Sequence, residues 1–261
     1  MTQSIFCIRK MGEFFMSNSP KILVLLLLIV SVSGVASCAA NPGAGQLSGS
    51  HQVSQLVGQN SNDAYADIPP DQIRQAGTEV DFLWDPKDPF YGFNKYPVVA
   101  RVHIDSIDGG RTSSPVSEQP VFPQTFGKMS VREVYKGDLK PGTQLAYSRV
   151  GGTVTYDDYW NSLNKEQQEK ILQLNRGQKP TDSKYVQAKI TDDIDIEVGK
   201  EYVALLLPQA PKDNSHSEYA ITGYQFGLRE IRGTGSDSTI LNNETHTWEG
   251  LSTMVEVPSQ R

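Results

Sequence analysis

The alternation of apolar and polar residues after residue 97 predicts a series of β-strands. Within VVARVHIDSI (98–107), every second residue from Val98 to Ile104 is apolar, whereas Arg101, His103 and Asp105 lie between them. Successive side chains of a strand point to opposite faces, so this segment is expected to be a half-buried strand. Gly109-Gly110 is expected to end it, and a Ser- and Pro-rich loop would continue to Pro123.

Further strands are predicted along the rest of the chain. The segment 202–207 (YVALLL) is apolar on both faces, which indicates the most buried strand. The other predicted strands cover residues 126–135, 143–150, 193–198, 218–224 and 226–231.

One helix is predicted between these two groups of strands. Asn164 is placed to cap it, Gln167 completes a capping-box pattern, and Gly177 is placed to end it. Ile171 and Leu174, together with Leu172, are expected to form its buried side.

Three strands, a helix and then more strands define the expected fold class. The prediction is a mainly β domain, either a small OB-like barrel or a curled antiparallel sheet, with one helix inserted between strands 3 and 4. By element order alone the soluble part resembles OB-type barrels, including netrin-like inhibitor domains, and a fold of this kind does not define a function.

A different pattern occupies the start of the chain. Ile22–Val30 is an unbroken apolar run, and the segment 22–36 has about 15 residues, fewer than the roughly 20 that a membrane-spanning helix needs. Small residues follow, which is typical of a cleavable signal. Val35-Ala36-Ser37-Cys38 resembles the bacterial lipobox, and the resemblance implies cleavage before Cys38 and lipidation of its thiol. The signal peptide is therefore predicted over 1–37, with Met16 as the favoured true start.

Composition divides the remainder into a tether and a domain. Residues 38–77 are rich in Gly, Ser, Gln and Asn, which favours a lipidated, flexible tether. Residues 78–261 are predicted to form a single β-rich domain with a polar C-terminal tail.

The predicted mature chain is acidic. Removal of 1–37 takes away three basic and one acidic side chain, leaving 21 basic and 29 acidic ones, a net charge of −8. This balance opposes nucleic-acid binding. Cys38 would be the only remaining cysteine, which excludes an intrachain disulfide.

The segment 82–96 (FLWDPKDPFYGFNKY) is the strongest candidate for recognition. Two interpretations stay open: a binding surface, because exposed aromatic rings are common anchors, or a lid whose rings pack on the open end of the core. The candidate ligand-binding residues are Trp84, Phe90, Tyr91, Phe93 and Tyr96.

Other candidate chemistry is weaker. The acids Asp192, Asp193, Asp195 and Glu197 offer calcium-type oxygen ligands, but their alternation with apolar residues favours a solvated strand face. His216 and Glu218 could share a metal, although the sequence places no third ligand nearby. We therefore expect no metal and no cofactor.

Together these features predict a lipid-anchored binding or interaction protein of the bacterial cell envelope, without catalysis. It would be held in the membrane through Cys38 on the extracellular face, with an envelope protein or polymer as its partner. The alternative is an envelope-polymer hydrolase, which would need His103, His216 or His246 within hydrogen-bond distance of a carboxylate or a serine.

Overall fold

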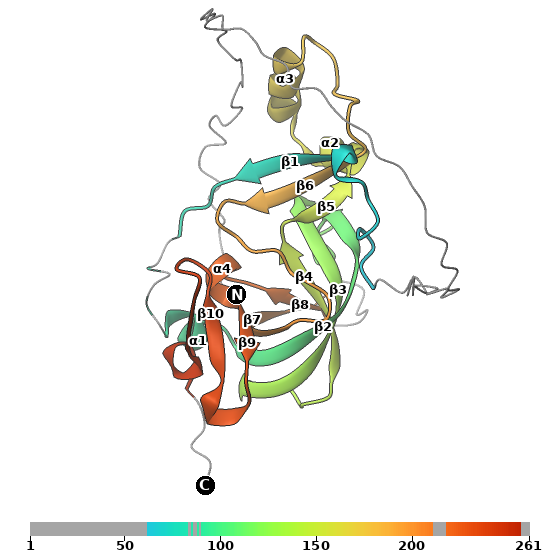
Figure 1. The fold of residues 1–261 in the computed structure, drawn as a ribbon. Coiled ribbons are helices and arrows are strands. Elements are labelled where there is room, and N and C mark those ends of the chain that lie inside the picture. Colours follow the sequence, from blue (N-terminus) through green and yellow to red (C-terminus); the bar gives the residue numbers. More distant parts are fainter. Residues whose placement is uncertain (1–61, 83–84, 86–87, 89, 211–217, 257–261) are drawn as a thin grey trace, which may run out of the picture. The chain divides into compact units, whose positions relative to one another are not determined.

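The computed structural model describes residues 62–82, 85, 88, 90–210 and 218–256, which belong to one compact unit dominated by strands (Figure 1). The predicted signal peptide, Cys38 and the residues up to 61 lie outside the described part. The strands are β1 (Ile73–Thr78), β2 (Val98–Ser113), β3 (Pro120–Lys136), β4 (Gln144–Val150), β5 (Gly152–Thr155), β6 (Tyr185–Ile190), β7 (Glu201–Gln209), β8 (Glu218–Ile221), β9 (Leu228–Arg232), β10 (Thr239–Asn242) and β11 (Thr247–Gly250). The helices are α1 (Tyr91–Lys95), α2 (Tyr156–Ser162), α3 (Lys165–Leu174) and α4 (Tyr224–Gly227), with single 3-10 turns η1 (Pro70–Gln72), η2 (Gly235–Asp237) and η3 (Leu251–Thr253).

Five strands close a small barrel. The order around it is β2, β3, β4, β8 and β7, and β7 pairs back with β2. Only the β4–β8 pair is parallel. The helices α2 and α3 enter between the third and fourth barrel strands, β4 and β7. The predicted barrel-like β fold with a helical insertion is therefore confirmed.

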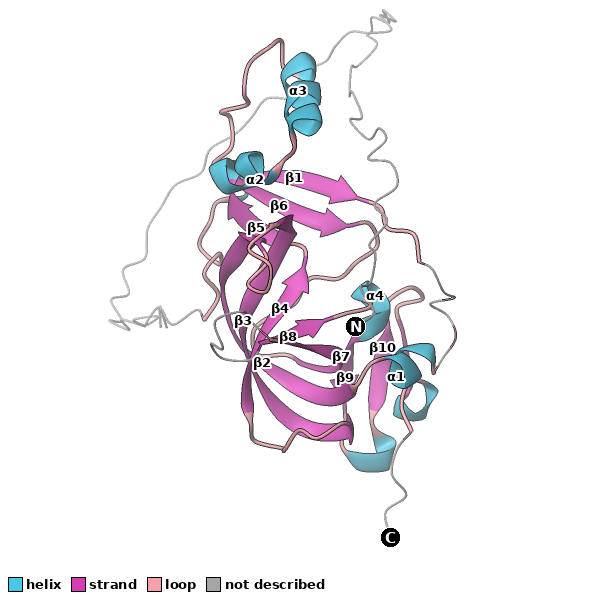
Figure 2. Cartoon of the chain, turned by 180° about the vertical axis from the view of Figure 1, so that it is seen from behind, coloured by secondary structure: helices cyan, strands magenta, loops and turns pink. Residues whose placement is uncertain are grey.

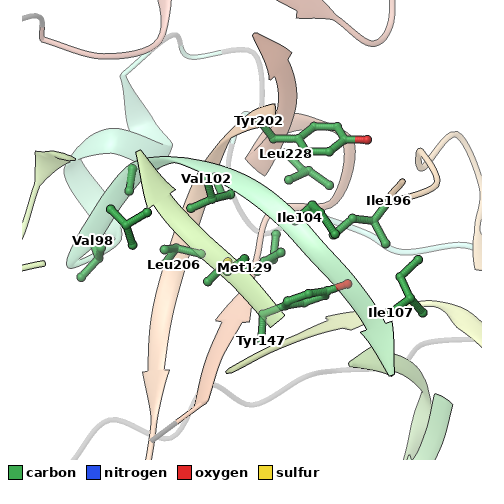
Figure 3. Close-up of a cluster of buried hydrophobic side chains, with 14 residues drawn as sticks. Val98, Val102, Ile104, Ile107, Met129, Tyr147, Ile196, Tyr202, Leu206 and Leu228 are labelled. Atoms are coloured by element: carbon green, nitrogen blue, oxygen red, sulfur yellow. The ribbon is translucent and has the colours of Figure 1, made fainter. Parts of the chain in front are cut away.

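The barrel interior holds the main hydrophobic core (Figure 3). Val98, Val102 and Ile104 of β2 point into it, as the alternation predicts, and Tyr202 and Leu206 of β7 meet them there. The intervening Val203 and Leu205 are equally buried on the outer face of β7. The prediction that this strand is buried on both faces is confirmed.

A second core covers that outer face. In this second core, Phe93 of α1 and Val99 of β2 pack with residues from the C-terminal part of the chain, namely Ile240, Leu251 and Met254. The C-terminal region is therefore not a polar tail as far as Val255. β10 pairs with β9, which pairs with β7, and the apolar residues that follow are buried in the second core. A mostly polar sequence here still supplies one buried face.

The β-rich domain begins earlier than predicted. Residues 73–78, which the tether prediction included, form β1 in a small sheet of order β1, β6, β5. β1 pairs in parallel with β6 through residues 185–190, more than 100 positions later. Composition could not reveal this strand, because its hydrogen bonds go to a partner distant in the sequence.

The hairpin of β2 and β3 is longer than predicted. Gly109 and Gly110 continue the strand instead of ending it, and a series of irregularities in register bends the hairpin. A Cβ at Gly110 would lie 1.9 Å from the carbonyl oxygen of Thr153, so the glycine allows β5 to cross closely. A bulge at Arg132 also changes the alternation in β3, which turns Val134 toward the barrel core and Tyr135 toward the second core.

The predicted strand 193–198 is a loop. Its residues Ile194, Ile196 and Val198 still face the core, where they close one part of the barrel interior. Alternation here reflects an extended segment that packs on the core without a strand neighbour. We call residues 192–199 the plug segment.

The predicted helix is confirmed, but its predicted buried side is wrong. Asn164 and Gln167 form the reciprocal capping box, and the amide of Gly177 donates to the carbonyl of Leu172. No residue of α3 is buried, and Leu174 is 57 % exposed.

Candidate functional site

The aromatic segment lies over the second core rather than standing free in solvent. Phe93 is 8 % exposed, and the half-buried Phe90 and Tyr96 pack beside it. Tyr91 is also half-buried. Trp84 lies outside the described residues. Phe90, Phe93 and Tyr96 are thus brought together as packing residues, as the lid interpretation expects, but they pack on the outer face of β7 and not on the open end of the barrel core. Ligand binding by this group stays a prediction.

Local contacts fix the lid in place. Lys136 Nζ donates to the carbonyl oxygens of Phe93 and Asn94, at 2.6 and 3.0 Å, and lies 5.4 Å from the centre of the Phe93 ring. A cation at the carboxyl end of a helix neutralises carbonyl groups that have no partner within the helix. A Cβ at Gly92 would lie 2.5 Å from the Leu205 side chain, so α1 approaches β7 closely.

A polar cluster on the outer face of the barrel surrounds Asp105. One carboxylate oxygen lies 2.9 Å from His103 Nδ1, and the other accepts hydrogen bonds from Ser130 Oγ at 2.6 Å and Gln144 Nε2 at 3.1 Å. Asn62 donates its side-chain amide to the Asp105 carbonyl at 3.1 Å. The cluster therefore joins β2, β3 and β4 to the first described residue.

The order of groups in this cluster does not match a serine hydrolase. In a Ser-His-Asp triad the imidazole stands between the hydroxyl and the carboxylate, so that it can take the proton of serine. Here the carboxylate stands in the middle, and Ser130 donates to Asp105 instead of to His103. The distance that the hydrolase alternative requires is met by His103, but the arrangement does not activate Ser130. His246 lies exposed in the β10–β11 turn, and His216 is outside the described residues.

Asp105 gives the fold an expected dependence on pH. Partial burial alone would raise the pKa of this carboxyl, but the hydrogen bonds from Ser130, His103 and Gln144 outweigh it and hold the pKa below its ordinary value. The lowered pKa stabilises the folded state above the ordinary value of about 4, and this contribution is lost as the pH falls through the lowered pKa. We expect Asp105→Asn to reduce the free energy of unfolding at neutral pH, with the difference from wild type shrinking in acid.

Urea unfolding at a series of pH values measures this difference. Asp192→Asn, at an exposed acid, is the control and should change the free energy of unfolding at neutral pH by less than Asp105→Asn does. A constant difference between Asp105→Asn and wild type from neutral to acidic pH would contradict the role given to the carboxylate.

The acidic residues proposed as calcium ligands do not converge. Asp193 is buried and pairs with Arg149, whereas Asp195 pairs with Lys189 and Glu197 with Lys200 at the surface. Within the described residues, no group of three or more His, Cys, Asp or Glu side chains is arranged to hold a metal ion. The prediction of a solvated acidic face is wrong for Asp193.

Two buried or partly buried ion pairs were missed by the sequence analysis. Arg149 donates to Asp193 and, at 2.7 Å, to the carbonyl of Ile194. Arg111 makes a bidentate ion pair with Glu218: Nη2 donates to Oε1 at 2.5 Å and Nη1 donates to Oε2 at 2.9 Å. The partners are 44 and 107 positions apart, so no local pattern could connect them.

A shallow polar cavity of about 170 Å³ lies beside α2. Its lining residues are Thr112, Ser113, Glu118, Pro120, Asp158, Asn161 and Ser162. No basic residue lines it, which disfavours an anionic ligand, and α2 itself was not predicted.

No protein-family model matches the chain, and no curated protein matches it either. In the part of the chain that the structure describes, no helix is both long and apolar enough to cross a bilayer.

Proposed function

We propose that this chain is a lipid-anchored binding or interaction protein of the bacterial cell envelope and that it acts without catalysis. The observation that carries the proposal is the run Ile22–Val30 followed by Val35-Ala36-Ser37-Cys38. Two acyl chains on one cysteine hold a protein on a membrane far more firmly than one chain does. The described unit begins at Asn62, after the proposed anchor, so lipidation at Cys38 leaves its strands intact.

Two features of the described unit bear on the proposal, and only the first of them supports it. The charged outer face of the barrel carries the His103–Asp105–Ser130 cluster, whose order of groups does not suit nucleophilic catalysis. The aromatic residues of 82–96 that are described serve packing first. The body would then present its surface to an envelope protein or polymer while the anchor holds it nearby.

Replacement of Cys38 tests the anchor. We expect Cys38→Ala, produced in a bacterial host, to lose the lipid and the cleavage before residue 38, so that the uncleaved chain keeps the apolar run Ile22–Val30. Mass spectrometry of the intact protein measures the added mass. Cys7→Ala replaces the other cysteine of the chain and should leave lipidation unchanged. An unmodified Cys38 thiol in the wild-type protein, with residues 1–37 still attached, would overturn the proposal.

A further inference from the structure

Helix α3 (Lys165–Leu174) presents apolar side chains that the described chain covers only in part. Leu174 is 57 % exposed, and Ile171 and Leu172 are only half-buried. Figure 1 and Figure 2 show the helix beyond α2 and the three-stranded sheet, and the side chain of Gln168 connects it to the carbonyl of Trp160. A helix of this length is marginal on its own, so its apolar side is expected to gain a partner outside the described unit.

The charged residues of α3 are distributed as in a helix that lies on a membrane surface. At about 100° per residue, Leu174, Ile171 and Leu172 lie on one side of the helix, and Gln167 and Gln168 lie between them. Lys165 lies next to Leu172 and Lys170 lies next to Leu174, so the two lysines border this partly apolar stripe on either side. Glu166 and Glu169 lie on the opposite face. Lysine side chains at the border of an apolar stripe can keep their ammonium groups at lipid headgroups while their stems lie along the acyl boundary.

The local charge also differs in sign from the rest of the protein. Between Lys165 and Lys179 the chain carries four basic and two acidic side chains, whereas the whole chain carries 24 basic and 30 acidic ones. One of the four, Lys179, is paired with Asp157 of α2 at 2.6 Å, so the segment keeps an excess of one positive charge. An anionic surface would therefore repel most of the body and attract this segment. The charge complementarity favours an anionic bilayer over a second copy of the same acidic chain.

We propose that α3 is a second, reversible membrane contact that lies on an anionic lipid surface and orients the protein there. The proposal rests on the anchor at Cys38, because the anchor raises the effective concentration of α3 at the bilayer and so adds to an affinity that α3 has by itself. The 23 residues from 39 to 61 can span at most about 80 Å, which keeps the described unit close to the anchor.

Vesicle binding of the unlipidated protein tests this contact separately from the anchor. The chain from residue 38, with Cys38→Ser, is mixed with vesicles of phosphatidylglycerol and phosphatidylcholine or of phosphatidylcholine alone, and the bound fraction is measured by sedimentation. We expect binding to the anionic vesicles only, and about tenfold weaker binding for Leu174→Gln. Leu207→Gln changes the other large exposed hydrophobic residue of the described chain, on β7, and should bind like the parent. Circular dichroism checks that both variants keep the fold.

Several outcomes would overturn the contact. These are no binding to anionic vesicles, equal binding to both vesicle types, or equal loss in the two leucine variants. Self-association that is lost in Leu174→Gln without any vesicle binding would instead assign the stripe to a second copy. An unlipidated wild-type Cys38 together with intact vesicle binding would refute the anchor and leave the α3 contact standing.

Discussion

Asp193→Asn is expected to lower the free energy of unfolding by about 3–5 kcal/mol, because it leaves the charge of Arg149 buried without its counter-ion. The side chains of Arg149 and Asp193 are only 6 % and 2 % exposed. Burial raises the pKa of the Asp193 carboxyl, against the opposing effect of Arg149. Arg149 Nε is buried without a hydrogen-bond partner among the described residues. The guanidinium therefore depends on Asp193 and on the carbonyl of Ile194 for its stabilisation.

The pair also holds the plug segment. Arg149 donates to the carbonyl of Ile194, and Asp193 Oδ1 accepts from the amide of the same residue. Loss of the carboxylate should therefore loosen Ile194 and Ile196 where they close the barrel core. Hydrogen exchange of the plug segment should accelerate more than exchange of β2.

Asp195→Asn is the matched control for this prediction. Asp195 pairs with Lys189 at 2.9 Å, but its side chain is 60 % exposed, and pairs of this kind contribute about 0–1 kcal/mol. Urea unfolding of both variants measures the contrast. The double variant Asp193→Asn/Arg149→Met should cost less than the sum of the single variants, because it removes both charges. Equal effects of Asp193→Asn and Asp195→Asn would contradict the buried pair.

The features that the sequence predicted correctly are those with a local cause. The alternation in β2 and the two apolar faces of β7 follow from neighbouring residues, as does the capping box at Asn164. In contrast, β1 and β6 are stabilised by each other across more than 100 positions. The strand β5 has four residues, too few for a periodic pattern to stand out.

The candidate site was harder to predict because its environment also depends on residues that are distant in the sequence. Aromatic density in 82–96 indicated large side chains but not their environment, which is set by β7 and the C-terminal strands. The carboxylate of Asp193 matched a polar strand position, and only the distant Arg149 explains why it is buried. For α3 the sequence predicted a buried side that the structure does not show. Apolar spacing on a helix does not say whether a partner is present within the same unit.

Phe93→Ala is the second variant with a large expected effect, a loss of about 3–5 kcal/mol in the free energy of unfolding. Phe93 is 8 % exposed and lies in the second core, so truncation leaves a cavity between α1 and β7. It also removes the ring beneath Lys136 Nζ. Phe93→Leu keeps much of the volume and should cost clearly less than Phe93→Ala.

Tyr91→Ala distinguishes packing from recognition on the same helix. Tyr91 is half-buried and lies outside the second core, so its truncation should cost about 1 kcal/mol or less. Thermal and urea unfolding of the three variants measure the order Phe93→Ala, then Phe93→Leu, then Tyr91→Ala. A lid needs that order, because its rings act by filling the second core. If Phe93→Ala unfolds like wild type, the ring does not support the fold, and the segment 82–96 would have to be treated as a binding surface.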